Sequence, residues 1–217
     1  MSITLDQALP GISVAWMHAR NTTNVPSPAA LLEVMRTSVA SARSLADHPD
    51  NMVRKAAIRN MLRFGGYKPT GRGKPASEYL LNAAIDGGFP EINVLVDLAN
   101  LASLESLLPI SIVDVDRART RDFRVRRGRA GETYVFNASG QVIDLEDLLL
   151  VSGLPSDEPF LSPVKDCEAT KTRVDTREAF AVVYAPAGMQ GPALVAAKRM
   201  AELAVLHGGA EADFGIG

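Results

Sequence analysis

The sequence predicts one α+β domain, with helices mainly in its first half packed on a β-rich second half. From about residue 29 to residue 106, apolar residues recur with a helical period of about 3.6, interrupted by prolines and paired glycines. After Leu108-Pro109, short stretches alternate apolar and polar residues with the period of two of half-buried strands. Such short strands predict a mixed or antiparallel sheet, and an amphipathic stretch at about 192–207 predicts a closing C-terminal helix.

The length and composition set limits on the class of protein. The 217 residues suit a single domain, predicted here as 1–217, and contain no internal repeat. A chain of this length can bury a core without the help of a disulfide or a metal. Its only cysteine, Cys167, has no base beside it in the sequence, and its three histidines lie far apart. We therefore predict no intrachain disulfide, no metal and no cysteine nucleophile.

The predicted elements follow in order. A strand is expected at about 11–19, and helices at about 29–46, 50–64, 77–86 and 93–106, with a break at Asp47-His48-Pro49. Strands are expected at 110–113, 122–126, 132–137 and 141–143, from 148 onward, and at 179–185. Residues 153–163 contain three prolines and predict a loop, and residues 210–217 predict a loose tail.

The predicted helix at 93–106 is the most informative stretch. It is apolar almost all round, which is typical of a buried helix, but Asn93, Asp97 and Asn100 fall in one narrow wedge of its surface. Buried polar groups need hydrogen-bond partners. Either the wedge faces a pocket and fixes a polar ligand, or its side chains bind the backbone of neighbouring loops.

Two clusters of basic residues stand out in a chain whose net charge is −2. Residues 51–76 contain seven basic residues and no acid, and residues 117–129 contain seven arginines against Asp122 alone. Charge asymmetry of this kind can mark a binding surface for an anionic partner, or it can be a solvated face.

Several functions are not expected. The glycine-rich loop at 66–75 lacks the Gly-Lys-Ser/Thr ending of a phosphate loop, because Pro75 follows Lys74, so we predict no nucleotide cofactor. The first residues lack a basic segment followed by an apolar one, and no apolar run is long enough to cross a bilayer. We therefore predict a soluble, cytoplasmic protein with no membrane partner.

The central stretch also carries a family resemblance. The segments SEYLLNAAIDGGFPEINVLVDLANLASLESLLPI and DFRVRRGRAGETYVF resemble the tRNA-binding editing domain of the phenylalanyl-tRNA synthetase beta subunit, the B-three/B-four domain. The resemblance covers about residues 54–185. It is most specific in the Asn93–Asp97–Asn100 pattern and at Gly131-Glu132, and the chain resembles the free-standing members of this family.

The resemblance implies a tRNA partner and hydrolysis, in trans, of the ester that joins a wrong amino acid to tRNA. It makes Asp97, together with Asp166 or Glu168, the candidate catalytic residues, and Asn93, Asn100 and Glu132 the candidate substrate-binding residues. The candidate RNA-binding residues are Arg54, Arg59, Arg63, Arg72, Lys74, Arg124, Arg126 and Arg127. No cofactor is implied.

The sequence also departs from the family. The synthetase domain has a histidine near the position of Ile110-Ser111 and a glycine pair near Asp166, and this chain has neither. The amino acid that the synthetase rejects is therefore not assumed here. Two other functions stay open, a non-catalytic RNA-binding module and a small-molecule hydrolase or binding protein. A shared face for both basic clusters would favour the RNA-binding functions.

Overall fold

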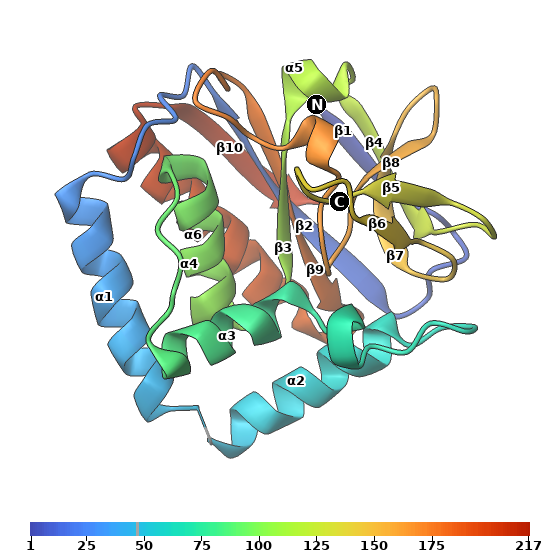
Figure 1. Cartoon of the computed structure of the whole chain (residues 1–217), viewed down its shortest axis with the longest axis horizontal. Coiled ribbons are helices and arrows are strands. Elements are labelled where there is room, and N and C mark those ends of the chain that lie inside the picture. Colours follow the sequence, from blue (N-terminus) through green and yellow to red (C-terminus); the bar gives the residue numbers. More distant parts are fainter. Residues whose placement is uncertain (47) are drawn as a thin grey trace.

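The computed structural model describes residues 1–46 and 48–217 and confirms the α+β class. Four helices precede residue 108, and the last helix follows the strand that ends at Pro186. The predicted order of helices is therefore also confirmed (Figure 1). The helices are α1 (Ala29–Ser44), α2 (Pro49–Leu62), α3 (Ala76–Asp86), α4 (Val94–Ser106), α5 (Val115–Ala118) and α6 (Gln190–Gly208). Short 3₁₀ turns cover Gly71–Gly73, Glu168–Thr170 and Ala187–Met189.

The strands form two four-stranded sheets and one two-stranded ribbon. The first sheet has the order β10 (Glu211–Ile216), β2 (Ile12–Arg20), β9 (Ala179–Pro186), β3 (Ile110–Asp114), and all of its pairs are antiparallel. The second has the order β1 (Ser2–Leu5), β4 (Asp122–Arg127), β7 (Leu149–Gly153), β8 (Glu158–Leu161), with β1 and β4 parallel. The ribbon pairs β5 (Thr133–Val135) with β6 (Val142–Asp144).

The first sheet is the base on which the helices pack. Helix α6 packs against β2, β9 and β10, and α4 packs against α6 and β3. Strand β9 is an apolar run, AFAVVYA, and its first seven residues are buried, as expected of a strand covered on both faces. In Figure 1 the helices α1 to α4 and α6 gather on one side of the molecule, and the second sheet and the ribbon lie on the other, with the short α5 beside β4.

Helix α4 is buried as its composition predicts. Val94, Leu98 and Leu101 have no exposed surface. Asn93 begins the helix, because its side chain accepts a hydrogen bond from the backbone N–H of Val96 (3.1 Å), which satisfies an amide at the helix start. Asn24 accepts a further bond from the N–H of Leu95 (3.0 Å).

Two predictions of irregular structure are wrong. Residues 211–216 form strand β10 rather than a loose tail, and β10 pairs with β2 in the register Gly215 to Trp16. Residues 158–161 form β8 within the predicted proline loop. Pro159 is tolerated there because it lies at a register shift of an edge strand, where no ladder hydrogen bond is needed from its nitrogen.

The break between α1 and α2 was predicted at Asp47-His48-Pro49. Asp47 lies outside the described residues, but His48 caps α2 by accepting a hydrogen bond from the N–H of Asp50, and Pro49 is its first residue. Over the described part of the chain, no helix combines the length and the apolar character that a membrane crossing requires.

Candidate functional site around Asp166

Asp166 has the most perturbed acidity among the candidate residues. It follows β8, and its carboxylate accepts hydrogen bonds from the backbone N–H groups of Ser162 (3.3 Å) and Ile112 (3.4 Å). Burial of the carboxyl raises the pKa of Asp166 from its ordinary value of 3.8 to about 7, against the opposite effect of these bonds. A carboxyl with this pKa can take up or release a proton near neutral pH.

Polar side chains from three other segments surround this carboxyl. Ser111, on β3, donates a hydrogen bond to the backbone carbonyl of Ser162 (2.8 Å). The hydroxyl of Tyr134, on β5, donates to the carbonyl of Lys165. The hydroxyl of Tyr184, on β9, is fully buried and has no hydrogen-bond partner among the described residues, although Ser111 and Asp166 lie near it. Burial raises the pKa of both tyrosines well above the usual range.

An open pocket of about 720 Å³ lies beside this cluster. The loop after α2 supplies Tyr67 and Arg72 to the pocket, the ribbon of β5 and β6 supplies Phe136 and Ile143, and Lys165 joins it to Asp166. In Figure 1 this loop is the turquoise segment below the ribbon. The remaining lining residues are Gly73, Gln141, Val142 and Asp144.

The structure separates the two acids of the 165–171 segment. Glu168 lies in a 3₁₀ turn and forms an ion pair with Lys171 (3.0 Å) and a longer one with Arg173 (4.0 Å). Asp166 has no ion pair among the described residues and faces Ser111 instead. Since the resemblance left the choice between Asp166 and Glu168 open, the geometry favours Asp166.

The wedge of α4 lies elsewhere, between α4 and its neighbouring loops. Asp97 has no exposed surface, and its two carboxylate oxygens accept hydrogen bonds from the hydroxyl of Ser27 (2.7 Å) and the N–H of Ile92 (2.8 Å). Asn93 is the helix cap, and Asn100 is partly buried without a hydrogen bond to a described residue. Asp97 thus has the contacts that the structural alternative requires, and its catalytic role stays a prediction.

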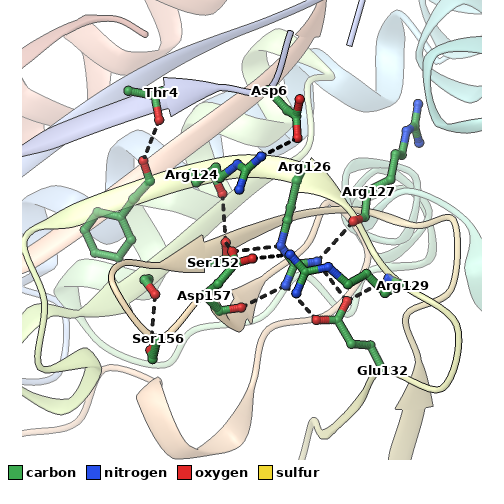
Figure 2. Close-up of polar contacts among 12 residues, drawn as sticks. Thr4, Asp6, Arg124, Arg126, Arg127, Arg129, Glu132, Ser152, Ser156 and Asp157 are labelled. Atoms are coloured by element: carbon green, nitrogen blue, oxygen red, sulfur yellow. Dashed lines mark hydrogen bonds and ion pairs between the residues drawn. The ribbon is translucent and has the colours of Figure 1, made fainter. Parts of the chain in front are cut away.

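Arg126 and Glu132 belong to an internal ion network, which Figure 2 shows. The side chain of Arg126 is 3% exposed and donates two hydrogen bonds to the carboxylate of Glu132 (2.6 and 2.8 Å) and one to that of Asp157 (2.9 Å). Glu132 also accepts from the N–H of Arg129 (2.7 Å). These contacts lower the pKa of Glu132, and that of Asp157 to about 2, despite their burial. Arg126 and Glu132 are therefore partners of each other within the protein. Arg126 presents almost no surface to RNA.

The remaining arginines of the second basic cluster are mostly paired. Arg124 binds Asp6 (2.7 Å). Arg127 donates hydrogen bonds to the carbonyls of Met61 (2.9 Å) and Leu62 (3.2 Å), at the C-terminal end of α2, where a cation is favoured. Further pairs are Arg117 with Asp175, Arg121 with Glu178 and Arg129 with Asp157. Each arginine of β4 therefore has a partner within the protein, and Arg126 is also buried.

The first basic cluster keeps more free charge. Arg59 pairs with Glu78, and Arg54 donates to the carbonyl of Ser106 (2.8 Å). Five other cations of the cluster have no ion pair with a described residue: Lys55, Arg63, Lys68, Arg72 and Lys74. The last three lie on the loop that lines the pocket. Net positive charge therefore gathers at the loop and not along β4.

Sequence reasoning missed most of the residues around Asp166. Ser111, Tyr134, Lys165 and Tyr184 are spread over more than seventy positions and come from β3, β5, the segment after β8, and β9. No local pattern joins them. The position of Ser111 was singled out only as the place where the synthetase domain has a histidine, and that place is indeed beside Asp166. Cys167 is buried, and burial raises its pKa, which disfavours a reactive thiolate.

Comparison with known proteins agrees with this architecture. The model of the B3/4 domain family matches residues 67–190, more than half of the 217 residues, and the chain belongs to this family. The matched span includes nearly all of the pocket loop, α4, Asp166 and all of β9.

The fold itself is similar to that of a solved protein. An N-terminal fragment of the phenylalanyl-tRNA synthetase beta subunit from Pyrococcus horikoshii superimposes with a TM-score of 0.55 and 11% sequence identity. The superposition covers 97% of this chain and 50% of that one, so the chain spans half the length of its structural relative. No curated protein matches the sequence.

Proposed function

We propose that this protein binds tRNA and hydrolyses, in trans, the ester between a wrongly attached amino acid and the tRNA 3′ end. Membership of the B3/4 family and the fold shared with a phenylalanyl-tRNA synthetase fragment support the RNA partner. Because one fold can host many functions, the proposal of ester hydrolysis depends on the residues of the site.

One observation carries the proposal. A carboxyl with a pKa of about 7, Asp166, directly follows Lys165, and Lys165 and Arg72 line a pocket in which neither has an acidic partner among the described residues. An aminoacyl ester is already activated, so its hydrolysis needs a positioned water and a weak base more than a strong nucleophile. In the proposed reaction Asp166 accepts a proton from the attacking water. The backbone N–H groups of Ser162 and Ile112 hold the carboxyl in place.

The test is single-turnover deacylation of a panel of aminoacyl-tRNAs, with ester loss as the readout. We expect loss of at least one ester, and a fall of 10²-fold or more in the Asp166→Asn variant, the typical contribution of a general base. Glu168→Gln is the matched control, because it removes a nearby carboxylate that is already paired with Lys171. Equal rates for wild type and Asp166→Asn would remove Asp166 from the reaction.

A second function, a non-catalytic RNA-binding module, is favoured by a specific observation. Both oxygens of Asp166 accept backbone hydrogen bonds, and Ser111 stands where the synthetase domain has a histidine. If the protein binds uncharged tRNA but cleaves none of the esters, this function is the correct one. If it binds no tRNA at all, the remaining alternative is a small-molecule hydrolase or binding protein.

A further inference from the structure

Two cations face the same pocket, and neither is paired with an acid. Lys165 and Arg72 both line it, and neither forms an ion pair with a described residue. Burial, together with the smaller effect of the Arg72 charge, lowers the pKa of Lys165. The two side chains therefore repel each other in a partly desolvated place, which is unfavourable unless a ligand relieves it.

The surroundings hold this pair in position. The ammonium group of Lys165 lies 3.8 Å from the centre of the Phe136 ring, so the side chain is extended along the pocket wall. A third cation, Lys171, donates to the backbone carbonyl of Phe136 (2.6 Å). The one acidic lining residue, Asp144, accepts a hydrogen bond from the N–H of Glu146 (3.0 Å) and pairs with neither cation.

We propose that this pocket is an anion site that binds the phosphate group of a nucleotide between Lys165 and Arg72. Two cations that share a pocket bind phosphate through charge-assisted hydrogen bonds. The volume of about 720 Å³ exceeds what a phosphate alone needs, and Tyr67, Ile143 and the rim of Phe136 offer apolar surface for the rest of a nucleotide.

The source of the nucleotide follows from the proposed function, on which this part of the inference rests. The 3′-terminal nucleotide of tRNA would place its phosphate in the pocket and its ester toward Asp166, the neighbour of Lys165. A free nucleotide shares the same chemistry. The binding experiment therefore needs three probes: inorganic phosphate, adenosine 5′-monophosphate, and a trinucleotide with the tRNA 3′ sequence.

Binding of the three probes is measured by calorimetry on the wild type and three variants. Lys165→Met keeps an unbranched side chain over Phe136 and removes the charge, and we expect it to weaken binding of the monophosphate by about 10- to 100-fold, the loss of one charge-assisted contact. Lys198→Met removes an exposed cation of α6 that is paired with Glu202 and does not line the pocket, and should leave monophosphate affinity unchanged. Asp144→Asn removes the opposing charge and should tighten binding.

Amine labelling gives an independent readout of the same site. A lysine with a lowered pKa is more nucleophilic at pH 8 than an ordinary lysine. We expect an amine-reactive reagent to label Lys165 ahead of Lys68, with the monophosphate protecting Lys165 only, as measured by mass spectrometry. Labelling of Lys165 that no probe reduces, with equal affinities for wild type and Lys165→Met, would overturn the proposal.

The outcomes separate this inference from the proposed function. Tight binding of phosphate probes with no ester hydrolysis would leave the anion site standing and refute the hydrolase. Ester hydrolysis by the wild type, with a KM that Lys165→Met leaves unchanged, would support the hydrolase and refute the anion site. A trinucleotide that binds no better than the free monophosphate would identify free nucleotides as the ligand instead of the RNA end.

Discussion

At the scale of single residues, the ionisation of Asp166 makes the stability of the fold depend on pH. Its pKa is about 7 in the folded protein and close to the ordinary value of 3.8 in the unfolded chain. Below pH 3.8 both states hold the proton, so the residue imposes no penalty. As the pH rises to about 7 the unfolded chain releases its proton first, and the folded state loses stability. This loss is complete once the pH has passed the folded pKa.

The first prediction concerns this pH dependence. From pH 5 to pH 8 the Asp166 carboxyl should lower the free energy of unfolding by up to about 2–3 kcal/mol, at about 1.4 kcal/mol per unit of pKa shift. Asp166→Asn cannot ionise and should lack this fall. Urea unfolding of both proteins at the two pH values tests it, and parallel pH profiles would show that the carboxyl does not titrate near 7.

Asp97 is the second prediction at this scale. Its oxygens bind Ser27 and Ile92, which lie on the segments before α1 and before α4. Asp97→Ala leaves both donors without a partner inside the protein and should lower the free energy of unfolding by about 2–4 kcal/mol. Asp97→Asn keeps the shape and part of the bonding, so its loss should be smaller.

Activity distinguishes this structural role from the catalytic one. If Asp97 only joins the two segments, the deacylation rate per folded molecule should equal that of the wild type in both variants. Thermal melting and single-turnover kinetics on one preparation supply both quantities. A stable Asp97→Asn variant with a greatly reduced deacylation rate would support a catalytic role for Asp97.

At the scale of elements, the network around Arg126 joins β4 to the turn before β5 and to the turn between β7 and β8. Both of its acids are partly buried, with side chains 20% and 17% exposed for Glu132 and Asp157. Removing only this cation leaves the partly buried Glu132 without an ion pair, and leaves Asp157 with the exposed Arg129 alone. The third prediction is that Arg126→Met lowers the free energy of unfolding by about 3–5 kcal/mol.

Arg129 provides the matched control for this prediction. It binds the same acid, Asp157, but its side chain is 60% exposed, so Arg129→Met should change stability by less than about 1 kcal/mol. Urea unfolding at pH 7 compares the two. Because the pKa of Asp157 is lowered to about 2, the stabilisation by Arg126 should disappear as the pH falls from about 4 to 2. Equal losses in the two variants would contradict the buried network.

Strand β10 is the other element whose role can be tested. It covers the edge of β2, and the indole N–H of Trp16 donates to the carbonyl of Ile216 (3.3 Å). The fourth prediction is that deletion of residues 211–217 lowers the melting temperature by roughly 5–15 °C, for a loss of about 2–4 kcal/mol. Fluorescence of Trp16, the only tryptophan, should shift to the red as its ring becomes exposed.

A surface substitution serves as the control for the deletion. Leu206→Ser lies on the exposed side of α6, with 74% of its surface accessible, and should leave both the melting temperature and the tryptophan emission nearly unchanged. An undisturbed emission maximum in the deleted protein would mean that β10 does not cover Trp16.

At the scale of the whole molecule, the distribution of free charge determines where RNA can bind. The arginines of β4 each have a partner within the protein, whereas Lys68, Arg72 and Lys74 have no ion pair among the described residues. The fifth prediction is that replacing these three with Ala flattens the log–log salt dependence of tRNA affinity by about 2–3. Filter binding between 50 and 200 mM salt measures the slope.

The control for the salt dependence removes the same charge elsewhere. Arg36, Arg173 and Lys198 are exposed and paired with nearby acids. Their joint replacement with Ala should leave the slope unchanged. An equal decrease of the slope in both triple variants would show that tRNA affinity depends only on the total charge of the protein.

The extent of the hydrophobic core bears on domain organisation. One cluster of buried residues runs from Leu9 to Ala210 and draws on both four-stranded sheets and on helices α1, α2, α4 and α6. Smaller clusters lie under the β5–β6 ribbon and between α3 and α4. A continuous core of this kind supports the proposal of a single domain over residues 1–217.

The sequence by itself determined the class of fold, the positions of the main helices and the burial of α4. These features depend on local periodicity, on breaks at Pro and Gly, and on capping groups such as Asn93, all of which act within a few residues. The family resemblance was also readable, because it rests on residues that are contiguous in the chain. The basic composition of the 66–75 loop was also readable, but only the tertiary structure shows that Lys68, Arg72 and Lys74 lack ion pairs with described residues.

Only the tertiary structure decided the edge strands, the buried arginine and the site. Residues 158–161 and 211–216 become strands because β7 and β2 offer unpaired edges. Arg126 is buried because Glu132 and Asp157 approach it from separate turns. Asp166 acquires a pKa of about 7 because β3 and β9 enclose it. Burial and charge partners arise from contacts between distant segments, so no local pattern of residues could have revealed them.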